Sequence, residues 1–172
     1  MAKRKTLPKD FEQLVKTGNE PDIKKVFDKC DINAYGGYNK GNAFEFLISE
    51  SMMRWLLEQG ADINYVDTYG YTPLLYHAGH KYAEEQAIQL VKLNADISAT
   101  EVWNHETVLH RAVSTGSLNL VKCLLEAGAD VGVTDANGNT PLECAFRNAM
   151  TFDLIKLEPV TVYLLSQGIP VT

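Results

Sequence analysis

The feature that most constrains the fold is a short word that recurs at a fixed interval. GADIN, NADIS and GADVG begin at Gly60, Asn94 and Gly128, so that 34 residues separate each word from the next. An acidic residue keeps the same interval after each of them: Asp67, Glu101 and Asp135. A constant period of this length is typical of proteins built from stacked structural units. The sequence therefore predicts a repeat array.

A second word follows each acidic residue and predicts where a helix begins. The segments are GYTPLL, HETVLH and GNTPLE, with a threonine at a common place: Thr72, Thr107 and Thr140. A threonine hydroxyl can accept a hydrogen bond from the exposed N–H groups of a first turn. Pro73 and Pro141 stand next, where a helix needs no N–H donor. We expect the first helix of each unit to begin directly after the threonine.

A second helix completes each unit, most clearly in LNLVKCLLEAG. Leu118, Val121, Leu124 and Leu125 follow one another at spacings that place them on one helix face. The word-initial Gly60 and Gly128, and also Gly168, then close a second helix in the left-handed conformation, a role that Asn94 takes in the third unit. Trp55, in MMRWLLEQG, is predicted to pack in the core or on the back of such a helix.

The segments GYTPLLYHA, ETVLHRAVSTGSLNLVKCLLEAGADV and GNTPLECA resemble the ankyrin-repeat family, whose pattern is T-P-L-H-x-A. The resemblance implies an all-α fold, an ankyrin-repeat solenoid of about five helix-turn-helix units with protruding loops. It implies one domain over residues 1–172, with units at about 7–33, 34–66, 67–100, 101–134 and 135–172. The first two units are degenerate.

Several positions depart from the family pattern. Only His110 occupies the histidine slot, where the resemblance implies a bond to the Thr107 hydroxyl and a tie between adjacent loops. Leu75 and Glu143 stand in the equivalent positions. The second unit lacks the Thr-Pro start, which predicts a stunted first helix. The fifth unit is longer, and Pro159 is predicted to open its final helix.

The charge and composition exclude some classes of partner. A net charge of −6 repels phosphate backbones, which argues against nucleic acid and favours a basic protein partner. No apolar run has the length of a signal peptide or a membrane helix. Three cysteines without metal-ligand spacing predict reduced thiols and a cytoplasmic location. Cys123 and Cys144 are expected to act as small apolar groups.

Candidates for catalysis and metal binding are few. The chain has no phosphate-binding glycine loop, no nucleophile elbow and no H-E-x-x-H motif, so we expect no catalytic residue, metal or cofactor. The alternative is a metal site or an enzyme built on His77, His80 and His105. A zinc site needs three or four converging ligands, and no carboxylate or thiolate completes a recognisable set with these histidines.

The family resemblance implies that a partner contacts the loop tips and the exposed ends of the first helices. The loop positions are Tyr35, Tyr38, Asp67, Thr68, Tyr69, Tyr71, Glu101, Val102, Trp103, His105, Ala136, Asn137 and Asn139. The helix positions are His80, Ser114, Thr115, Arg147 and Asn148. Tyrosine and tryptophan dominate the energetics of protein interfaces, and five of the loop positions are aromatic.

The sequence thus predicts a non-enzymatic protein–protein interaction module that binds another protein through a concave face and loop tips and is monomeric when free. A narrower hypothesis is an immunity or inhibitor protein for a toxin or an enzyme, because the chain resembles compact bacterial ankyrin proteins that are similar to toxin-neutralising immunity proteins. The rival to both is a structural or assembly scaffold.

Overall fold

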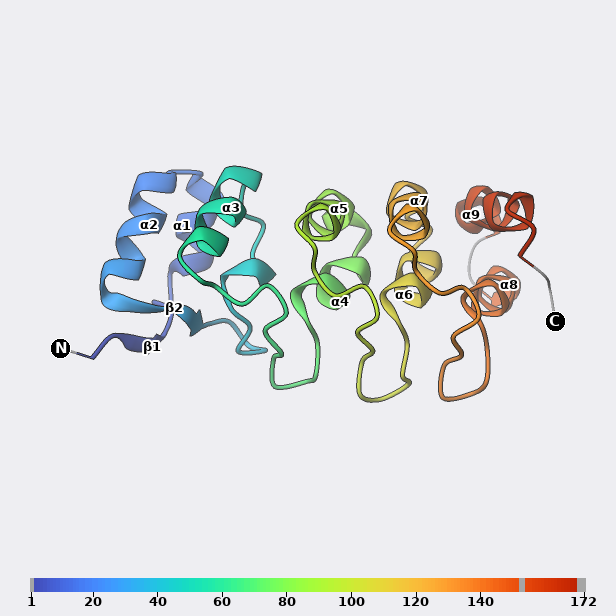
Figure 1. Cartoon of the computed structure of the whole chain (residues 1–172), viewed down its shortest axis with the longest axis horizontal. Coiled ribbons are helices and arrows are strands. Elements are labelled where there is room, and N and C mark those ends of the chain that lie inside the picture. Colours follow the sequence, from blue (N-terminus) through green and yellow to red (C-terminus); the bar gives the residue numbers. More distant parts are fainter. Residues whose placement is uncertain (1, 152–153, 170–172) are drawn as a thin grey trace. The chain divides into compact units, whose positions relative to one another are not determined.

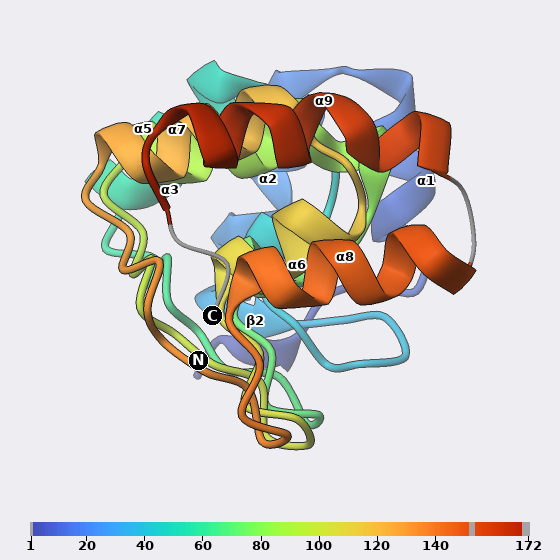
Figure 2. The same cartoon turned by 90° about the vertical axis from the view of Figure 1, so that its right-hand side faces the viewer.

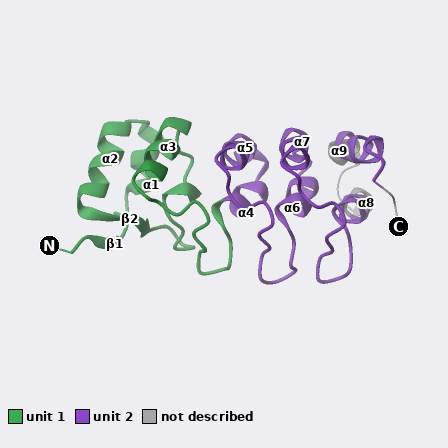
Figure 3. Cartoon of the chain, viewed as in Figure 1, with its two compact units in different colours: residues 1–73 green, residues 74–172 purple. Residues whose placement is uncertain are grey.

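The computed structural model describes the backbone of residues 2–151 and 154–169, with the side chains of all of these except 148–158. The chain consists of two compact units, Met1–Pro73 and Leu74–Thr172 (Figure 3). Each unit is described by itself below.

Unit 1 contains helices and a small sheet. Its elements are β1 (Arg4–Thr6), α1 (Phe11–Thr17), α2 (Glu20–Lys29), β2 (Cys30–Tyr35), the 3₁₀ helix η1 (Ala43–Glu45) and α3 (Glu50–Glu58) (Figure 1). β1 runs parallel to β2, with Arg4 opposite Cys30 and Thr6 opposite Tyr35. The expectation of an all-α chain was therefore wrong for this unit. α2 ends because Cys30 is extended, and the segment before α1 supplies β2 with a partner strand.

An aromatic cluster forms part of the core of unit 1. The ring of Phe11 meets Phe27 at 6.1 Å and Phe46 at 5.0 Å, both edge to face. Trp55 packs on Phe27 at 5.8 Å and carries the Lys24 ammonium 5.5 Å above its ring. Edge-to-face pairs add to the free energy of burial. Trp55 thus packs on its own unit, as its helical context predicted.

The degenerate second repeat, around residue 40 in unit 1, has a stunted first helix, as predicted. η1 spans only three residues and follows Asn42. The side-chain oxygen of Asn42 accepts the N–H of Phe44, and its side-chain amide donates to the carbonyl of Asp62 at 2.7 Å. Asn42 is fully buried. Its amide replaces the Thr-Pro start that this segment lacks.

Unit 2 is a helical repeat array. Its elements are α4 (Pro73–Ala78, which begins on the last residue of unit 1), η2 (Lys81–Ala83), α5 (Glu84–Lys92), α6 (Val108–Ser114), α7 (Leu118–Glu126), α8 (Pro141–Thr151) and α9 (Leu154–Ser166). In unit 2 the first helices α4, α6 and α8 form one layer and the second helices α5, α7 and α9 form another (Figures 1 and 2). The loops before α6 and α8 extend from the same side of this unit.

The predicted helix signals act at the predicted places in the array. Thr107 caps α6, and the second helices end at left-handed residues: Gly60, Asn94, Gly128 and Gly168, with φ of 84°, 63°, 87° and 75°. Pro159 was expected to open the last helix, and this was wrong. α9 begins at Leu154 and contains Pro159, so the helix starts earlier than the proline signal indicates.

Candidate functional site

Each of the three loops that bear the repeated acidic residue is folded around that side chain. The carboxylate of Asp67 accepts the N–H groups of Tyr69 and Tyr71, both at 2.8 Å. Asp135 accepts those of Asn137 at 2.8 Å and Asn139 at 2.9 Å, and Glu101 accepts that of Trp103 at 2.7 Å. Each carboxylate thus closes the loop in which it lies.

This geometry corrects part of the predicted contact set. Asp67 and Glu101 were included among partner-binding residues, but they are 7% and 2% exposed. Their oxygen atoms point into the loop that they close. A carboxylate held in this way positions the residues around it and presents almost no surface to a partner.

Neighbouring loops within each unit are tied together by one repeated bond. In unit 1, Thr68 donates its N–H at 3.0 Å and its hydroxyl at 2.7 Å to the carbonyl of Asn39. In unit 2, Ala136 donates its N–H to the carbonyl of Asn104 at 2.7 Å. The donor follows the loop aspartate in both cases. These bonds fix the spacing of adjacent loop tips.

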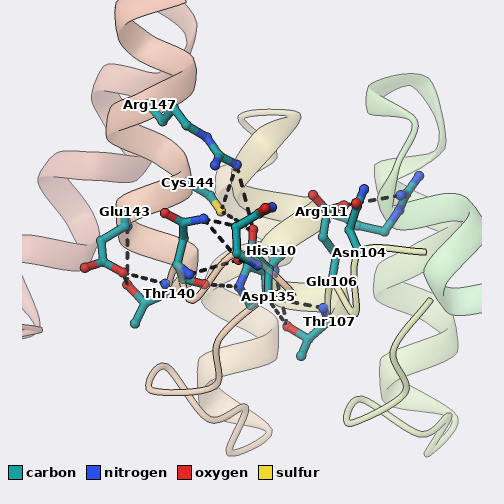
Figure 4. A network of polar contacts seen from close by, with 12 residues as sticks. Asn104, Glu106, Thr107, His110, Arg111, Asp135, Thr140, Glu143, Cys144 and Arg147 are labelled. Atoms are coloured by element: carbon teal, nitrogen blue, oxygen red, sulfur yellow. Dashed lines mark hydrogen bonds and ion pairs between the residues drawn. The ribbon is translucent and has the colours of Figure 1, made fainter. Parts of the chain in front are cut away.

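A polar network joins α6, α8 and the loop between α7 and α8 in unit 2 (Figure 4). The Nδ1 atom of His110 lies 2.9 Å from the hydroxyl of Thr107, and its Nε2 atom lies 3.0 Å from the carbonyl of Asn139. Both features that the family resemblance implied for His110 are therefore present. Asn139 also donates its amide to Asp135, which makes Asn139 a part of the network.

In α8, Glu143 provides the helix cap that His110 provides in α6. Its carboxylate accepts the N–H of Thr140 at 2.6 Å, while the Thr140 hydroxyl accepts the N–H of Glu143 at 3.3 Å. This reciprocal arrangement is a capping box, which satisfies two N–H groups at a helix start. The departure from the family pattern thus preserves the helix cap.

Electrostatics in this network favour an ionised Asp135. Burial acts to raise the pKa of Asp135, but hydrogen bonds from Asn139 and Asn137 outweigh it and lower the pKa to about 2. Burial and the Asp135 charge raise the pKa of the Cys144 thiol to about 11. Cys144 is therefore an inert, buried thiol, because the thiolate is the reactive form.

Aromatic side chains occupy the loop tips of unit 1. Tyr38 is 87% exposed and stacks on Tyr69, with ring centres 5.9 Å apart and planes 21° apart. A hydrogen bond with Tyr38 raises the pKa of the Tyr69 hydroxyl. Tyr35, Tyr69 and Tyr71 are half-buried, so they contribute less surface than Tyr38.

In unit 2, the loop before α6 carries the corresponding exposed group. Trp103 is 71% exposed and Val102 is 56% exposed. His105 is exposed and has a positive φ of 53°, which places it at the turn of this loop. The Glu101 carboxylate holds the backbone under Trp103, so the indole is presented by an ordered loop.

The predicted helix positions differ in their accessibility. His80 lies between the rings of Tyr76 at 4.8 Å and Tyr82 at 5.3 Å. Ser114 and Arg147 are exposed, and Thr115 is half-buried and donates its hydroxyl to the Ala78 carbonyl at 3.3 Å. The side chain of Asn148 lies outside the described residues.

Tyr82 is a surface residue that the sequence pattern missed. It is 71% exposed on η2, next to His80. An aromatic residue in the charged segment HKYAEE, between two helices, was the available signal.

The histidine alternative finds little support in the geometry. His77 is buried in α4, whereas His105 is exposed on a loop tip. Within the described ranges, no group of three or more His, Cys, Asp or Glu side chains is arranged to hold a metal ion.

Comparison with known proteins agrees with the repeat geometry. A family model described as "Ankyrin repeats (3 copies)" matches residues 80–169. The chain belongs to the ankyrin-repeat family. Ankyrin repeats bind other proteins, so membership supports a role in protein–protein interaction. In the described part of this ankyrin-repeat chain, no helix is both long and apolar enough to span a membrane.

The chain is similar to parts of larger relatives. "Putative palmitoyltransferase ZDHHC13" of Danio rerio is 30% identical over 133 residues, which are 77% of this chain and 19% of that protein. "Ankyrin repeat protein OPG189" of Variola virus is 27% identical over 64% of this chain and 20% of its own length. "B-cell lymphoma 3 protein homolog" of Mus musculus is 33% identical over 59% of this chain and 22% of its own length. The ankyrin-repeat chain thus spans a fifth or so of these relatives.

Proposed function

We propose that this ankyrin-repeat protein is a non-enzymatic module that binds another protein through its loop tips and the exposed face of its first helices. The observation that carries the proposal is the exposure of large aromatic groups on ordered loops. Trp103 is 71% exposed directly beside the buried Glu101 that closes its loop. An exposed indole held in one geometry loses little entropy on binding, so its burial contributes to affinity.

The contact set that we propose combines the accessible members of the sequence prediction with one addition, Tyr82. Its exposed members are Tyr38, Thr68, Val102, Trp103, His105, Asn137, Tyr82, Ser114 and Arg147, and the half-buried Tyr69 and His80 join them. Tyr35, Tyr71 and Thr115 are half-buried and would contact a partner at their edges. Asn148 is included in the proposed contact set because of its position in the sequence alone.

A basic partner is part of the proposal, on the ground of long-range attraction. The net charge of −6 would steer a basic protein toward the chain. The loop carboxylates do not supply this attraction at contact, because Asp67, Glu101 and Asp135 are buried in their own loops. Local complementarity would come from the aromatic groups instead.

We further propose that the whole chain functions as one domain of five repeat units and is monomeric when free. Its narrower role is that of an inhibitor, such as an immunity protein that blocks a toxin or another enzyme. The chain itself carries no catalytic activity in this proposal, and its three free cysteines suit a cytoplasmic setting.

The test begins with purification of the partner from native cells and its identification by mass spectrometry. Tyr69→Ala combined with Trp103→Ala should weaken binding to that partner by at least about tenfold, while helical circular dichroism and melting stay nearly unchanged. Val162→Ala is the control, because Val162 is 59% exposed on α9, away from the loops. It should leave the affinity unchanged.

Two outcomes would reject the proposal. The first is loss of folding in the double variant, which would mean that these rings belong to the core. The second is concentration-dependent assembly in light scattering with no other protein bound, which would support a scaffold instead.

A further inference from the structure

The half-buried Glu45 and the buried Asp67 carry two carboxyl groups that interact electrostatically in unit 1. Glu45 ends η1, and its carboxyl group lies directly against the backbone of Gly41. A Cβ atom added to Gly41 would stand 1.7 Å from the carboxyl carbon of Glu45 and 1.9 Å from each of its oxygens. The Oε1 atom of Glu45 and the Oδ2 atom of Asp67 are buried and have no hydrogen-bond partner among the described residues.

The groups around Glu45 disfavour a second negative charge. Burial and the charge of Asp67 raise the pKa of Glu45 to about 8. Burial and then the neighbouring Tyr35, Glu45 and Asp67 raise the pKa of Tyr65 in the same cluster. No lysine or arginine forms an ion pair with Glu45 in the described part of the chain. Asp67 already accepts two loop N–H bonds, which suit an anion, so Glu45 is the group that stays neutral.

The backbone that touches this pair leads directly to the stacked tyrosines. Gly36 donates its N–H to the carbonyl of Gly41 at 2.8 Å, which closes the hairpin that carries Tyr38. Asp67 closes the loop that carries Tyr69. The two loops are also joined where the Thr68 hydroxyl donates to the carbonyl of Asn39. A change at Glu45 therefore acts on the base of both loops.

We propose that the neutral carboxyl of Glu45 is a positioning group for the Tyr38–Tyr69 pair, and that its ionisation loosens both loops and weakens binding of a protein partner through them. The effect on the partner rests on the proposed function. The loop response does not, because it is measured on the free chain.

The first experiment follows unfolding by urea over a range of pH. Glu45 binds a proton more tightly in the folded chain than in the unfolded chain, so the wild type should lose stability as pH rises from about 5 to about 8 and then level off. Glu45→Gln keeps the shape of the side chain and cannot ionise. It should abolish this fall and be more resistant to urea than the wild type at pH 8. Glu12→Gln is the matched control, since Glu12 is exposed and pairs with Lys16 at 2.8 Å.

Nuclear magnetic resonance of the wild-type chain gives a local measurement, so it does not require that any variant folds. The amide signals of Tyr69 and Tyr71 and the carboxyl signal of Glu45 should shift together, with a midpoint near the pKa of about 8. A Glu45 midpoint below about 5.5 would overturn the proposal, because that is close to an ordinary glutamate. Unshifted amides would overturn it as well.

Gly41→Ala supplies a second variant that retains the glutamate. The added methyl group must displace the end of the flexible Glu45 side chain, so Glu45 should move to solvent and regain an ordinary midpoint. A Gly41→Ala variant that keeps the wild-type pH dependence would contradict the geometry.

The partner measurement separates this inference from the proposed function. Between pH 7 and 9, wild-type affinity should fall by about fivefold or more, whereas Glu45→Gln should lack this fall. If the loop signals titrate with Glu45 as predicted but no binding partner is found, the proposed function is rejected and the positioning role of Glu45 stands. Partner binding with the same pH dependence in both proteins would reject the role of Glu45 and leave the proposed function standing.

Discussion

The Nε2 atom of His110 lies 3.0 Å from the carbonyl oxygen of Asn139, 29 residues further along the chain. On the other side of the ring, Nδ1 accepts the N–H of Thr107 at 3.2 Å. The hydrogen of the neutral ring is therefore on Nε2, which donates it to Asn139. One side chain thus caps α6 and holds the loop that precedes α8 (Figure 4).

His110→Ala removes both of these bonds at once. We expect the free energy of unfolding of the chain to fall by about 1–3 kcal/mol, because a cap is lost and a buried carbonyl loses its donor. Urea titration followed by circular dichroism measures the change. Lys92→Ala, on the exposed side of α5, is the control and should stay within about 0.5 kcal/mol of the wild type. An equally small change for His110→Ala would show that the network is dispensable.

Glu143 allows a separate test of the cap on α8. Glu143→Gln keeps an oxygen that can accept the N–H of Thr140, so most of the stability should remain. Glu143→Ala should cost about 1 kcal/mol, as loss of a helix cap typically does. Comparison of the two melting curves measures the cap itself. Equal losses in both variants would mean that charge, rather than capping geometry, matters at this position.

Asp135 makes the stability of the fold depend on pH. Its pKa of about 2 in the folded chain lies below the ordinary 3.8, so its ionised form stabilises the fold above that value. This contribution disappears as pH falls through the folded pKa. Asp135→Asn should cost about 1 kcal/mol near neutral pH, because neutral hydrogen bonds replace charge-assisted ones. Unfolding measured at several pH values should show the difference from wild type shrinking below the ordinary value of 3.8. A difference that does not vary with pH would be the contrary result.

Leu124 tests the packing of the second-helix layer. It is fully buried on α7, and Leu124→Ala should lower the free energy of unfolding by about 2–5 kcal/mol. Leu165→Ala on α9 is the control, since Leu165 is 43% exposed and its truncation leaves little cavity. If Leu124→Ala and Leu165→Ala destabilise the chain equally, the burial assigned to α7 is incorrect.

Predictions from the sequence were most accurate where a physical rule acts over a few residues. The cap at Thr107 and the left-handed Asn94 both depend on local geometry within a few positions. The stunted helix η1 was equally visible, because its segment lacks a Thr-Pro start.

The sequence alone therefore determined the repeat, its period and the caps and turn residues that bound most of its helices, since hydrophobic spacing, caps and turn residues act locally. Tertiary structure decided which side chains face solvent and which strands pair. β1 pairs with a strand more than twenty residues away, Tyr38 stacks on Tyr69, and Glu45 loses water beside Gly41 and Asp67. These relationships depend on contacts between segments distant in sequence, and the shift in the Glu45 pKa exists only when those contacts remove its water.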